Sequence, residues 1–223
     1  TIPTQHLRAF LVKHRETFPP GAILVNGAKG IETGTLTTPY EVMLDELPGK
    51  YHRRLAVVSG PSFAREVALN MPTNVTVAGN DIEIARAVQG MLADVNFRVY
   101  TNRDMIGTEI GGAVKNVLAI AAGASDGFGF GHNALAGLIT RGLAEMTRLA
   151  EKKGGSAMTL AGLAGMGDLV LTCTGDQSRN RLVGFRLARG EPLADIMASM
   201  RMVAEGIPTS ISLHHLSHKL DVD

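Results

Sequence analysis

The sequence predicts an α/β unit followed by an all-helical unit, and three observations carry this prediction. Over 1–102, short apolar runs alternate with helical patterns, which is typical of a parallel, doubly wound sheet covered on both faces. Over 103–223, helical patterns follow one another without a convincing strand. The first part holds too few strand candidates for a whole doubly wound domain. We therefore expect only the second part of such a sheet.

The first predicted elements are a helix, a strand and a second helix. Apolar residues recur at helical spacing over 1–18, and Pro19-Pro20-Gly21 ends that helix. The apolar run 22–25 is consistent with a buried strand. After the loop 26–30, a second helical pattern covers 37–47.

Three further short apolar runs predict buried strands at 55–58, 74–78 and 97–100. A helix through Phe63 and Val67 connects the first two of these strands. Asp81 is a suitable N-cap for the helix that connects the last two, because its side chain can accept from a free backbone N–H. In a doubly wound sheet, ligands sit beyond the carboxyl ends of the strands. Several loops of this half are therefore expected to share one rim.

The helical half begins with a long helix over 107–124 and continues through a glycine-rich loop at 127–131. The next helix, 134–152, places its apolar residues inward and carries an Arg141–Glu145 pair four residues apart. Four further helices are expected. One follows the cap Ser156 and ends near Gly165, and the next covers 179–189, between the cap Ser178 and the stop Gly190. The last two begin at Pro192 and at Pro208 or Thr209.

Composition narrows the class of protein. Of 223 residues, 45% are hydrophobic and 19% charged, which is ordinary for a globular chain. The net charge of +1 gives no support to a nucleic-acid or anionic-membrane partner. Cys173 is the single cysteine, which indicates a reducing compartment. No apolar run reaches the roughly 18 residues of a membrane span and no signal-peptide pattern is seen, so the expected location is cytoplasmic.

Lys115 is the only charged residue between Ile110 and Ala124 of the long predicted helix. None of its helical neighbours is a carboxylate, and the glycine pair at 111–112 leaves space in the turn over which its side chain leans. A desolvated, unpaired lysine has a lowered pKa, which suits general acid/base chemistry. The alternative is a lysine that extends from a helix end with its stem along apolar surface.

Three other stretches offer polar groups for a ligand. Lys29 and 59–62 follow strands and are placed at one rim by topology alone, although ordinary turns have the same composition. Asp168 follows a tight glycine turn and is either a functional carboxylate or a helix cap. The stretch 178–181 puts a hydroxyl, a guanidinium and an amide at a helix N-terminus, where backbone N–H groups attract anions such as phosphate.

Other chemistries find less support. GFGFGH at 127–132 fails the dinucleotide fingerprint at its final position and follows no strand. His214 and His218 have the spacing of a helical metal pair, but no third ligand is evident, so we predict no metal site. Cys173 has no base nearby in the sequence and is predicted to be a buried structural thiol.

Seven segments resemble the bacterial NAD(P)-dependent glycerol-3-phosphate dehydrogenases. They occur in family order and span most of the chain. The segments are AKGIE (28–32), SGPSFAREVA (59–68), FRVYTN (97–102), GGAVKNVLAIAAGASDGFGFGHNA (111–134), LITRGLAEM (138–146), GLAGMGDLVLTCTGDQSRNR (162–181) and VAEG (203–206).

The resemblance implies a Rossmann-like NAD(P)-binding domain, of which 1–102 is the C-terminal part, and a helical domain like that of 6-phosphogluconate dehydrogenase at 103–223. The implied reaction interconverts dihydroxyacetone phosphate and sn-glycerol 3-phosphate with NAD or NADP, for phospholipid synthesis. Lys115 is the implied catalytic acid/base. The implied substrate-binding residues are Lys29, Gly60, Ser62, Lys115, Asp168, Ser178, Arg179 and Asn180. The implied cofactor-binding residues are Lys29, Ala64, Arg179, Val203 and Glu205.

Several points stay open on the sequence alone. We expect an internal segment of the family's enzyme, without its first nucleotide-binding half and its last helices, and inactive on its own. Ala28 stands where the family pattern leads us to expect a hydroxyl residue. The alternatives are a related 3-hydroxyacid or 6-phosphogluconate dehydrogenase, or a non-catalytic phosphate-binding protein on the same scaffold. The sequence does not choose between NADH and NADPH, and a homodimer is one of the assemblies it allows.

Overall fold

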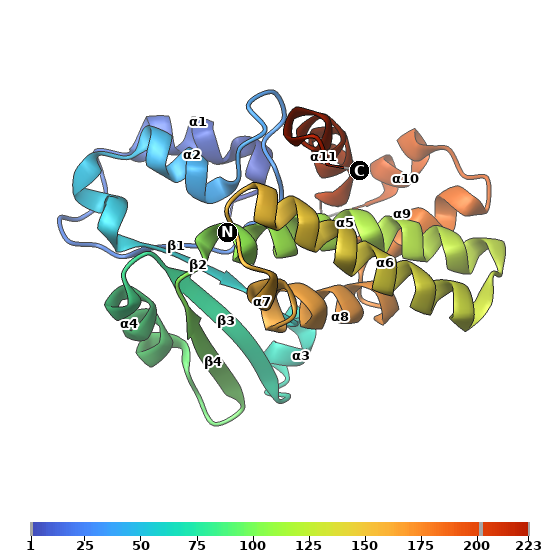
Figure 1. The fold of residues 1–223 in the computed structure, drawn as a ribbon, viewed down its shortest axis with the longest axis horizontal. Coiled ribbons are helices and arrows are strands. Elements are labelled where there is room, and N and C mark those ends of the chain that lie inside the picture. The colour runs from blue at the N-terminus through green and yellow to red at the C-terminus, as the bar shows by residue number, and fades with distance from the viewer. Residues whose placement is uncertain (1, 201–202, 223) are drawn as a thin grey trace.

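The structure, a computed structural model, describes residues 2–200 and 203–222. A four-stranded sheet with its helices forms one half of the molecule, and a group of helices around α5 forms the other (Figure 1). The strands are β1 (Leu24–Asn26), β2 (Leu55–Ser59), β3 (Thr73–Gly79) and β4 (Phe97–Asn102). The helices are α1 (Thr4–His14), α2 (Pro39–Glu46), α3 (Ala64–Ala68), α4 (Ile82–Leu92), α5 (Met105–Phe128), α6 (Gly131–Lys152), α7 (Ala157–Leu160), α8 (Asp168–Thr174), α9 (Arg179–Ala188), α10 (Leu193–Ser199) and α11 (Gly206–Leu220).

The sheet is mixed, which corrects the prediction of a wholly parallel one. Its order is β1-β2-β3-β4; the outer pairs are parallel, but β2 and β3 are antiparallel, with Val57 opposite Ala78. The connection from β2 to β3 holds only the short helix α3, about 7.5 Å long, and no helix that retraces the length of the strand. After α3 the chain runs back beside β2.

Both faces of the sheet are covered, as predicted. On one face, residues of α1 and α2 pack with Leu55, Val57 and Met105 in a single buried cluster. On the other face, Val75, Val77 and Val99 pack against Ala85 and Val88 of α4, which lies alone on its side of the sheet in Figure 1.

Several element ends differ from the sequence prediction. The loop expected at 127–131 is mostly helical, since α5 runs to Phe128, Gly129 adopts the left-handed conformation that ends it, and α6 starts at Gly131. The helix capped by Ser156 stops at Leu160 and is followed by a π-helical segment, Leu163–Gly167.

α5 is the central helix of the second half and packs against α6, α8, α9 and α11. By length and composition it could cross a membrane, which corrects the expectation that no segment is long and apolar enough. However, 72% of its most apolar window is buried within the structure, as in the core helix of a globular protein. Its apolar residues, including Ile110 and Ala119, belong to the largest buried cluster. The composition of α5 therefore matches its place in this core.

Glycines let α5 and α9 approach each other closely. A Cβ on Gly184 of α9 would overlap the carbonyl oxygen of Ile120, and one on Gly123 of α5 would overlap that of Arg181. This close crossing fixes the N-terminus of α9 relative to α5. The backbone on each side leaves no flexible group that could move away.

We expect Gly184→Ala to lower the free energy of unfolding by about 1–3 kcal/mol, the usual cost of inserting a methyl group into a packed contact. Gly137→Ala on α6 is the matched control, because a Cβ there meets nothing within 4 Å. The control should be neutral or stabilising by up to about 1 kcal/mol, from helix propensity. Denaturant unfolding of this chain measures both, and equal stability of the two variants would contradict the close crossing.

Candidate active site

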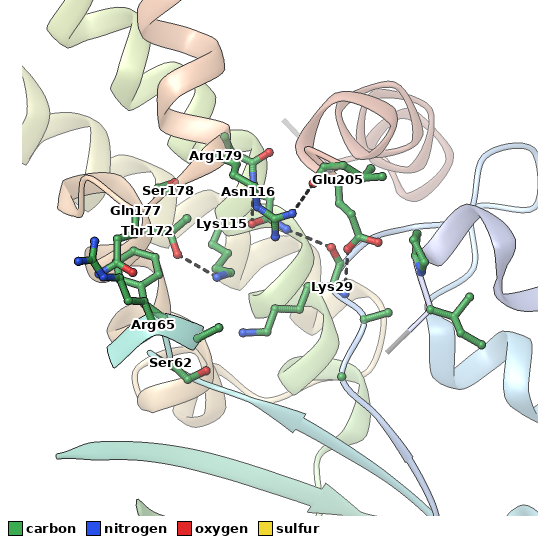
Figure 2. A pocket seen from close by; sticks show the side chains of 18 residues that line it. Lys29, Ser62, Arg65, Lys115, Asn116, Thr172, Gln177, Ser178, Arg179 and Glu205 are labelled. Carbon is green, nitrogen blue, oxygen red and sulfur yellow. Dashed lines mark hydrogen bonds between the residues drawn. The ribbon is translucent and has the colours of Figure 1, made fainter. Parts of the chain in front are cut away.

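A cavity of about 690 Å³ lies where the sheet half meets the helical half. Its wall is formed by the loop after β1, the start of α3, the middle of α5, the N-terminus of α9 and the segment before α11 (Figure 2). Nine of the eleven residues predicted to bind ligands line it: Lys29, Ser62, Ala64, Lys115, Ser178, Arg179, Asn180, Val203 and Glu205. Gly60 and Asp168 do not. Asp168 is 1% exposed and lies beneath the lysines, and the carbonyl oxygen of Gly60 accepts from Lys29 at 3.3 Å.

Lys115 is paired, which corrects the expectation of an unpaired lysine. Its Nζ lies 2.6 Å from Oδ1 of Asp168 and donates to Thr172 Oγ1 at 2.8 Å. The second oxygen of the same carboxylate binds Lys29 Nζ, also at 2.6 Å. One buried carboxylate therefore holds two ammonium groups. Asp168 is the first residue of α8, with Gly167 at the cap position, so the carboxylate serves the lysines and does not cap the helix.

Burial and charge set the protonation of this group. Burial, together with the nearby charge of Lys29, lowers the pKa of Lys115 to about 8, although Asp168 opposes the shift. Burial acts to raise the pKa of Asp168, but the two ammonium groups outweigh it and hold that pKa below the ordinary value. Near neutral pH, Lys115 is therefore an ammonium that gives up its proton more readily than an ordinary lysine.

The glycine pair before Lys115 serves close packing and not the open space that the sequence suggested. A Cβ on Gly111 would overlap the carbonyl oxygen of Ala164 in the π-helical segment. A Cβ on Gly112 would lie 3.0 Å from Ser59 Oγ and 3.2 Å from Lys29 Cγ. These glycines bring α5 against the segment that leads to Asp168 and against the stem of Lys29. The pairing of Lys115 with Asp168 depends on that approach.

A chain of amide hydrogen bonds ties the walls of the cavity together. Asn116 donates to the carbonyl oxygen of Lys29 at 3.0 Å and accepts from Asn180 Nδ2 at 3.0 Å. Asn180 in turn accepts from the backbone N–H of Gly206 at 3.0 Å. The loop after β1, α5, α9 and the start of α11 are thus fixed to one another. Asn180, which is 8% exposed, both takes part in these hydrogen bonds and lines the cavity.

The N-terminus of α9 has the composition and geometry of an anion site. Ser178 is its cap and accepts from the backbone N–H of Arg181 at 3.2 Å, as predicted. Arg179 extends over the cavity and donates from Nη1 to the carbonyl oxygen of Val203 at 2.8 Å (Figure 2). Its other donors carry no hydrogen bond to a described carboxylate, so the first turn of α9 presents a guanidinium and free N–H groups to the cavity.

Glu205 closes the opposite wall. Its carboxylate accepts from the backbone N–H of Thr4 at 2.8 Å and from that of Lys29 at 3.2 Å. The start of α1, the Lys29 loop and the segment before α11 therefore meet at one carboxylate. Val203, 48% exposed, adds an apolar surface beside it.

Comparison with known proteins identifies the family to which the chain belongs. The profile described as NAD-dependent glycerol-3-phosphate dehydrogenase N-terminus matches residues 1–85, and that of the C-terminus of the same family matches residues 104–223. The chain belongs to the NAD-dependent glycerol-3-phosphate dehydrogenase family. The expected resemblance is thereby confirmed, and so is the expected pairing of a Rossmann-like part with a helical part.

Individual members of the family align over the whole chain. Glycerol-3-phosphate dehydrogenase [NAD(P)+] of Geobacter sulfurreducens is 55% identical over 99% of the chain, and that of Geobacter sp. strain M21 is 54% identical over 100%. The chain spans 66% of the length of each of these relatives. A crystal structure of glycerol-3-phosphate dehydrogenase from Coxiella burnetii, 41% identical, superposes over 100% of this chain and 67% of its own with a TM-score of 0.93.

Three residues of this site were not predicted from the sequence of this dehydrogenase-family chain. Thr172 follows Asp168 by four residues, a spacing visible in the sequence that places both on one helical face, but it was not predicted as a site residue. Arg65 of α3 and Gln177 of the turn before α9 line the cavity from segments far apart in the sequence, and Gln177 donates to Glu66 of α3 at 2.9 Å. No local sequence pattern indicates that these two segments meet.

The other residues singled out from the sequence lie outside the site. His214 and His218 contact each other ring to ring, with centroids 4.5 Å apart. The residues described by the structure hold no group of three potential metal ligands. Cys173 is fully buried, as predicted, and burial raises the pKa of its thiol to about 12.

Proposed function

We propose that the protein interconverts dihydroxyacetone phosphate and sn-glycerol 3-phosphate by hydride transfer with NAD or NADP, and so supplies glycerol 3-phosphate for phospholipid synthesis. Besides the family to which the chain belongs, one structural observation supports this proposal. The buried ammonium of Lys115, with its lowered pKa, and the cationic N-terminus of α9 line the same cavity. A three-carbon phosphate needs both of these features, a proton donor for its ketone and an anchor for its dianion.

The cavity wall fits the nicotinamide end of the cofactor. Gly27, Ala28, Ala64 and Val203 give it a small-residue and apolar surface on which a planar ring can lie, beyond the carboxyl end of β1. The Lys29 and Lys115 side chains lie near each other in this cavity (Figure 2). When bound, the nicotinamide supplies or accepts the hydride at C2. We assign contact with the cofactor to Lys29, Ala64, Arg179, Val203 and Glu205.

In the direction of reduction, Lys115 polarises the C2 carbonyl as an ammonium and transfers its proton to that oxygen as the hydride arrives at carbon. In oxidation, the neutral amine takes the hydroxyl proton while C2 loses its hydride. Asp168 keeps the ammonium oriented through the 2.6 Å contact. Lys29, held by the same carboxylate, contributes a second positive charge near the developing alkoxide.

The phosphate end is assigned to α9. Arg179 offers a bidentate fork, and the N–H groups of the first turn and the helix dipole attract the dianion. Ser178 and Asn180 border the same position, while Gly60 and Ser62 line the substrate loop opposite. In this assignment, residues 1–102 carry the cofactor side and residues 103–223 the substrate side.

The direct test is oxidation of NADH and NADPH by the complete encoded protein with dihydroxyacetone phosphate. We expect turnover with this ketone and at least about 100-fold lower kcat/KM with unphosphorylated dihydroxyacetone, because the anchor at α9 is then unused. Turnover of a 3-hydroxyacid or of 6-phosphogluconate in its place would assign the chain to a related dehydrogenase. Absence of any turnover would favour a non-catalytic phosphate-binding protein.

The cellular setting follows as part of the same proposal. Cys173 is the single cysteine and can form no disulfide within the chain, which fits a reducing compartment, so we place the protein in the cytoplasm. A homodimer is the assembly to test first, by light scattering of the complete encoded protein.

A further inference from the structure

Glu109 is a buried carboxylate that the proposed mechanism does not use. It lies on α5, is 3% exposed, and has no cationic partner among the described residues. It accepts instead from Asn26 Nδ2 at 2.8 Å and from the backbone N–H of Tyr40 at 2.9 Å. An unpaired charge is costly to bury. A carboxylate kept in such a place therefore calls for an explanation.

Asn26 passes this contact on to the loop before Lys29. Its Oδ1 accepts from the N–H of Ala28 at 2.9 Å, and its Nδ2 donates to the carbonyl oxygen of the same residue at 3.2 Å. Both polar groups of Ala28 are thus held by one side chain, which Glu109 orients.

The loop meets a single face of α5. Glu109, Gly112 and Asn116 follow at intervals of three and four residues, so they lie along one side of the helix. Glu109 holds the loop before Lys29, Gly112 leaves room for the Lys29 stem, and Asn116 binds the Lys29 carbonyl oxygen at 3.0 Å. The helix that carries Lys115 therefore also sets the position of Lys29.

We propose that Glu109 is a positioning residue: through Asn26 it fixes the backbone that precedes Lys29 and so places the Lys29 ammonium between Asp168 and the cavity. Removal of the carboxylate leaves the Lys29 side chain chemically intact but releases the loop that carries it. The consequence for catalysis rests on the proposed function, whereas the consequence for the loop does not.

The protonation of Glu109 supports this role. Burial raises its pKa to about 7, although its hydrogen bonds act to lower it. The charged group that faces it is Glu41 of α2, which raises the pKa further and is itself bound to Lys153 at 2.6 Å. The Thr38 hydroxyl, the Tyr40 N–H and the Asn26 amide all donate to Glu109, so a proton on the carboxyl group places a hydrogen against these donors. The loop should therefore be held more loosely below about pH 7.

The test compares Glu109→Gln with the wild type in the complete encoded protein. We expect amide hydrogen exchange at Ala28 to become about tenfold faster, the equivalent of one weakened hydrogen bond to a charged group, with exchange in β3 unchanged. KM for dihydroxyacetone phosphate should rise about tenfold, a larger change than that in kcat. In the wild type, KM should rise as the pH falls through 7, and in the variant this dependence should be absent.

A reciprocal exchange separates positioning from general damage. Asn26→Asp alone places a second carboxylate against that of Glu109, and it should speed Ala28 exchange and raise KM. Combined with Glu109→Gln, it restores a carboxylate–amide pair with the polarity reversed, and both readouts should return toward wild type. Glu145→Gln on α6 is the matched control, because Glu145 is an exposed carboxylate that pairs with Arg141 and not with the loop, and it should leave Ala28 exchange unchanged.

Three outcomes would overturn the proposal. These are unchanged Ala28 exchange in Glu109→Gln, faster exchange throughout β3 as well, which indicates global destabilisation, and no recovery in the double variant. Failure of the proposed function is distinguishable, because the wild type would then show no turnover while the exchange measurements still decide the role of Glu109.

Discussion

Replacement of Lys115 by alanine is expected to lower kcat for dihydroxyacetone phosphate by about 10²–10⁴-fold, the usual contribution of a positioned general acid. The ammonium faces the cavity, and Thr172, the other group bonded to it, cannot donate a proton of comparable acidity. KM should change less, since the phosphate is anchored at α9. Steady-state kinetics of the complete encoded protein measure both parameters.

Two comparisons make this result specific. Lys115→Arg keeps the positive charge but has a pKa far too high to exchange its proton, so its kcat should stay close to that of the alanine variant. Lys13→Ala removes an exposed lysine from the last turn of α1 and should leave kcat unchanged. Full activity in Lys115→Arg would contradict the proton-transfer role and would show that only the positive charge of the side chain matters.

Replacement of Asp168 by asparagine is expected to reduce both stability and activity strongly. The change leaves the ammonium groups of Lys29 and Lys115 close together in a buried site without their shared counterion. Breaking a buried ion pair in this way costs about 3–5 kcal/mol of unfolding free energy. The pKa of Lys115 should fall further from its value of about 8, so the limb of the pH–rate profile that reports it should move to lower pH.

The sign of the pH dependence of stability follows from the direction of the shift. The folded protein holds the pKa of Asp168 below its ordinary value, so this carboxylate stabilises the fold at neutral pH. That contribution is lost as the pH falls through the folded-state pKa. The deficit of Asp168→Asn should therefore be largest near pH 7 and shrink below about pH 4. Denaturant unfolding at several pH values measures it.

The control for this prediction is Asp176→Asn. Asp176 also pairs with a cation, Arg181, but its side chain is 98% exposed. A surface pair of this kind contributes about 0–1 kcal/mol. Equal loss of stability in the two variants would contradict the buried counterion as the cause.

Local features of this fold were predictable from the sequence because local chemistry determines them. Asp81, Ser156 and Ser178 cap their helices with side-chain hydrogen bonds, as their residue types and positions predict. The strands β2, β3 and β4 match the predicted apolar runs within two residues at each end. The end of α5 was misplaced because a glycine-rich stretch has no strong local preference. The packing of α5 against α9 determines where this helix ends.

Tertiary contacts account for what was missed. The antiparallel pairing of β3 with β2 is a tertiary contact, which composition does not reveal. Lys115 seemed unpaired because its carboxylate lies 53 residues further along the chain and only folding brings them together. Glu109 was overlooked for the same reason, since Asn26 and Tyr40 approach it from other elements. The residues of the cavity were largely identified by resemblance, and their mutual bonds only by the structure.

The central claim is that an amine at the position of Lys115 transfers the proton, and chemical restoration of that amine tests it most directly. In Lys115→Cys, alkylation with 2-bromoethylamine rebuilds a lysine-like side chain, while the buried Cys173, whose pKa is about 12, should not react. Mass spectrometry confirms a single modification. We predict that kcat for dihydroxyacetone phosphate returns to within about tenfold of wild type. A fully alkylated variant that stays as slow as the untreated one would contradict the claim.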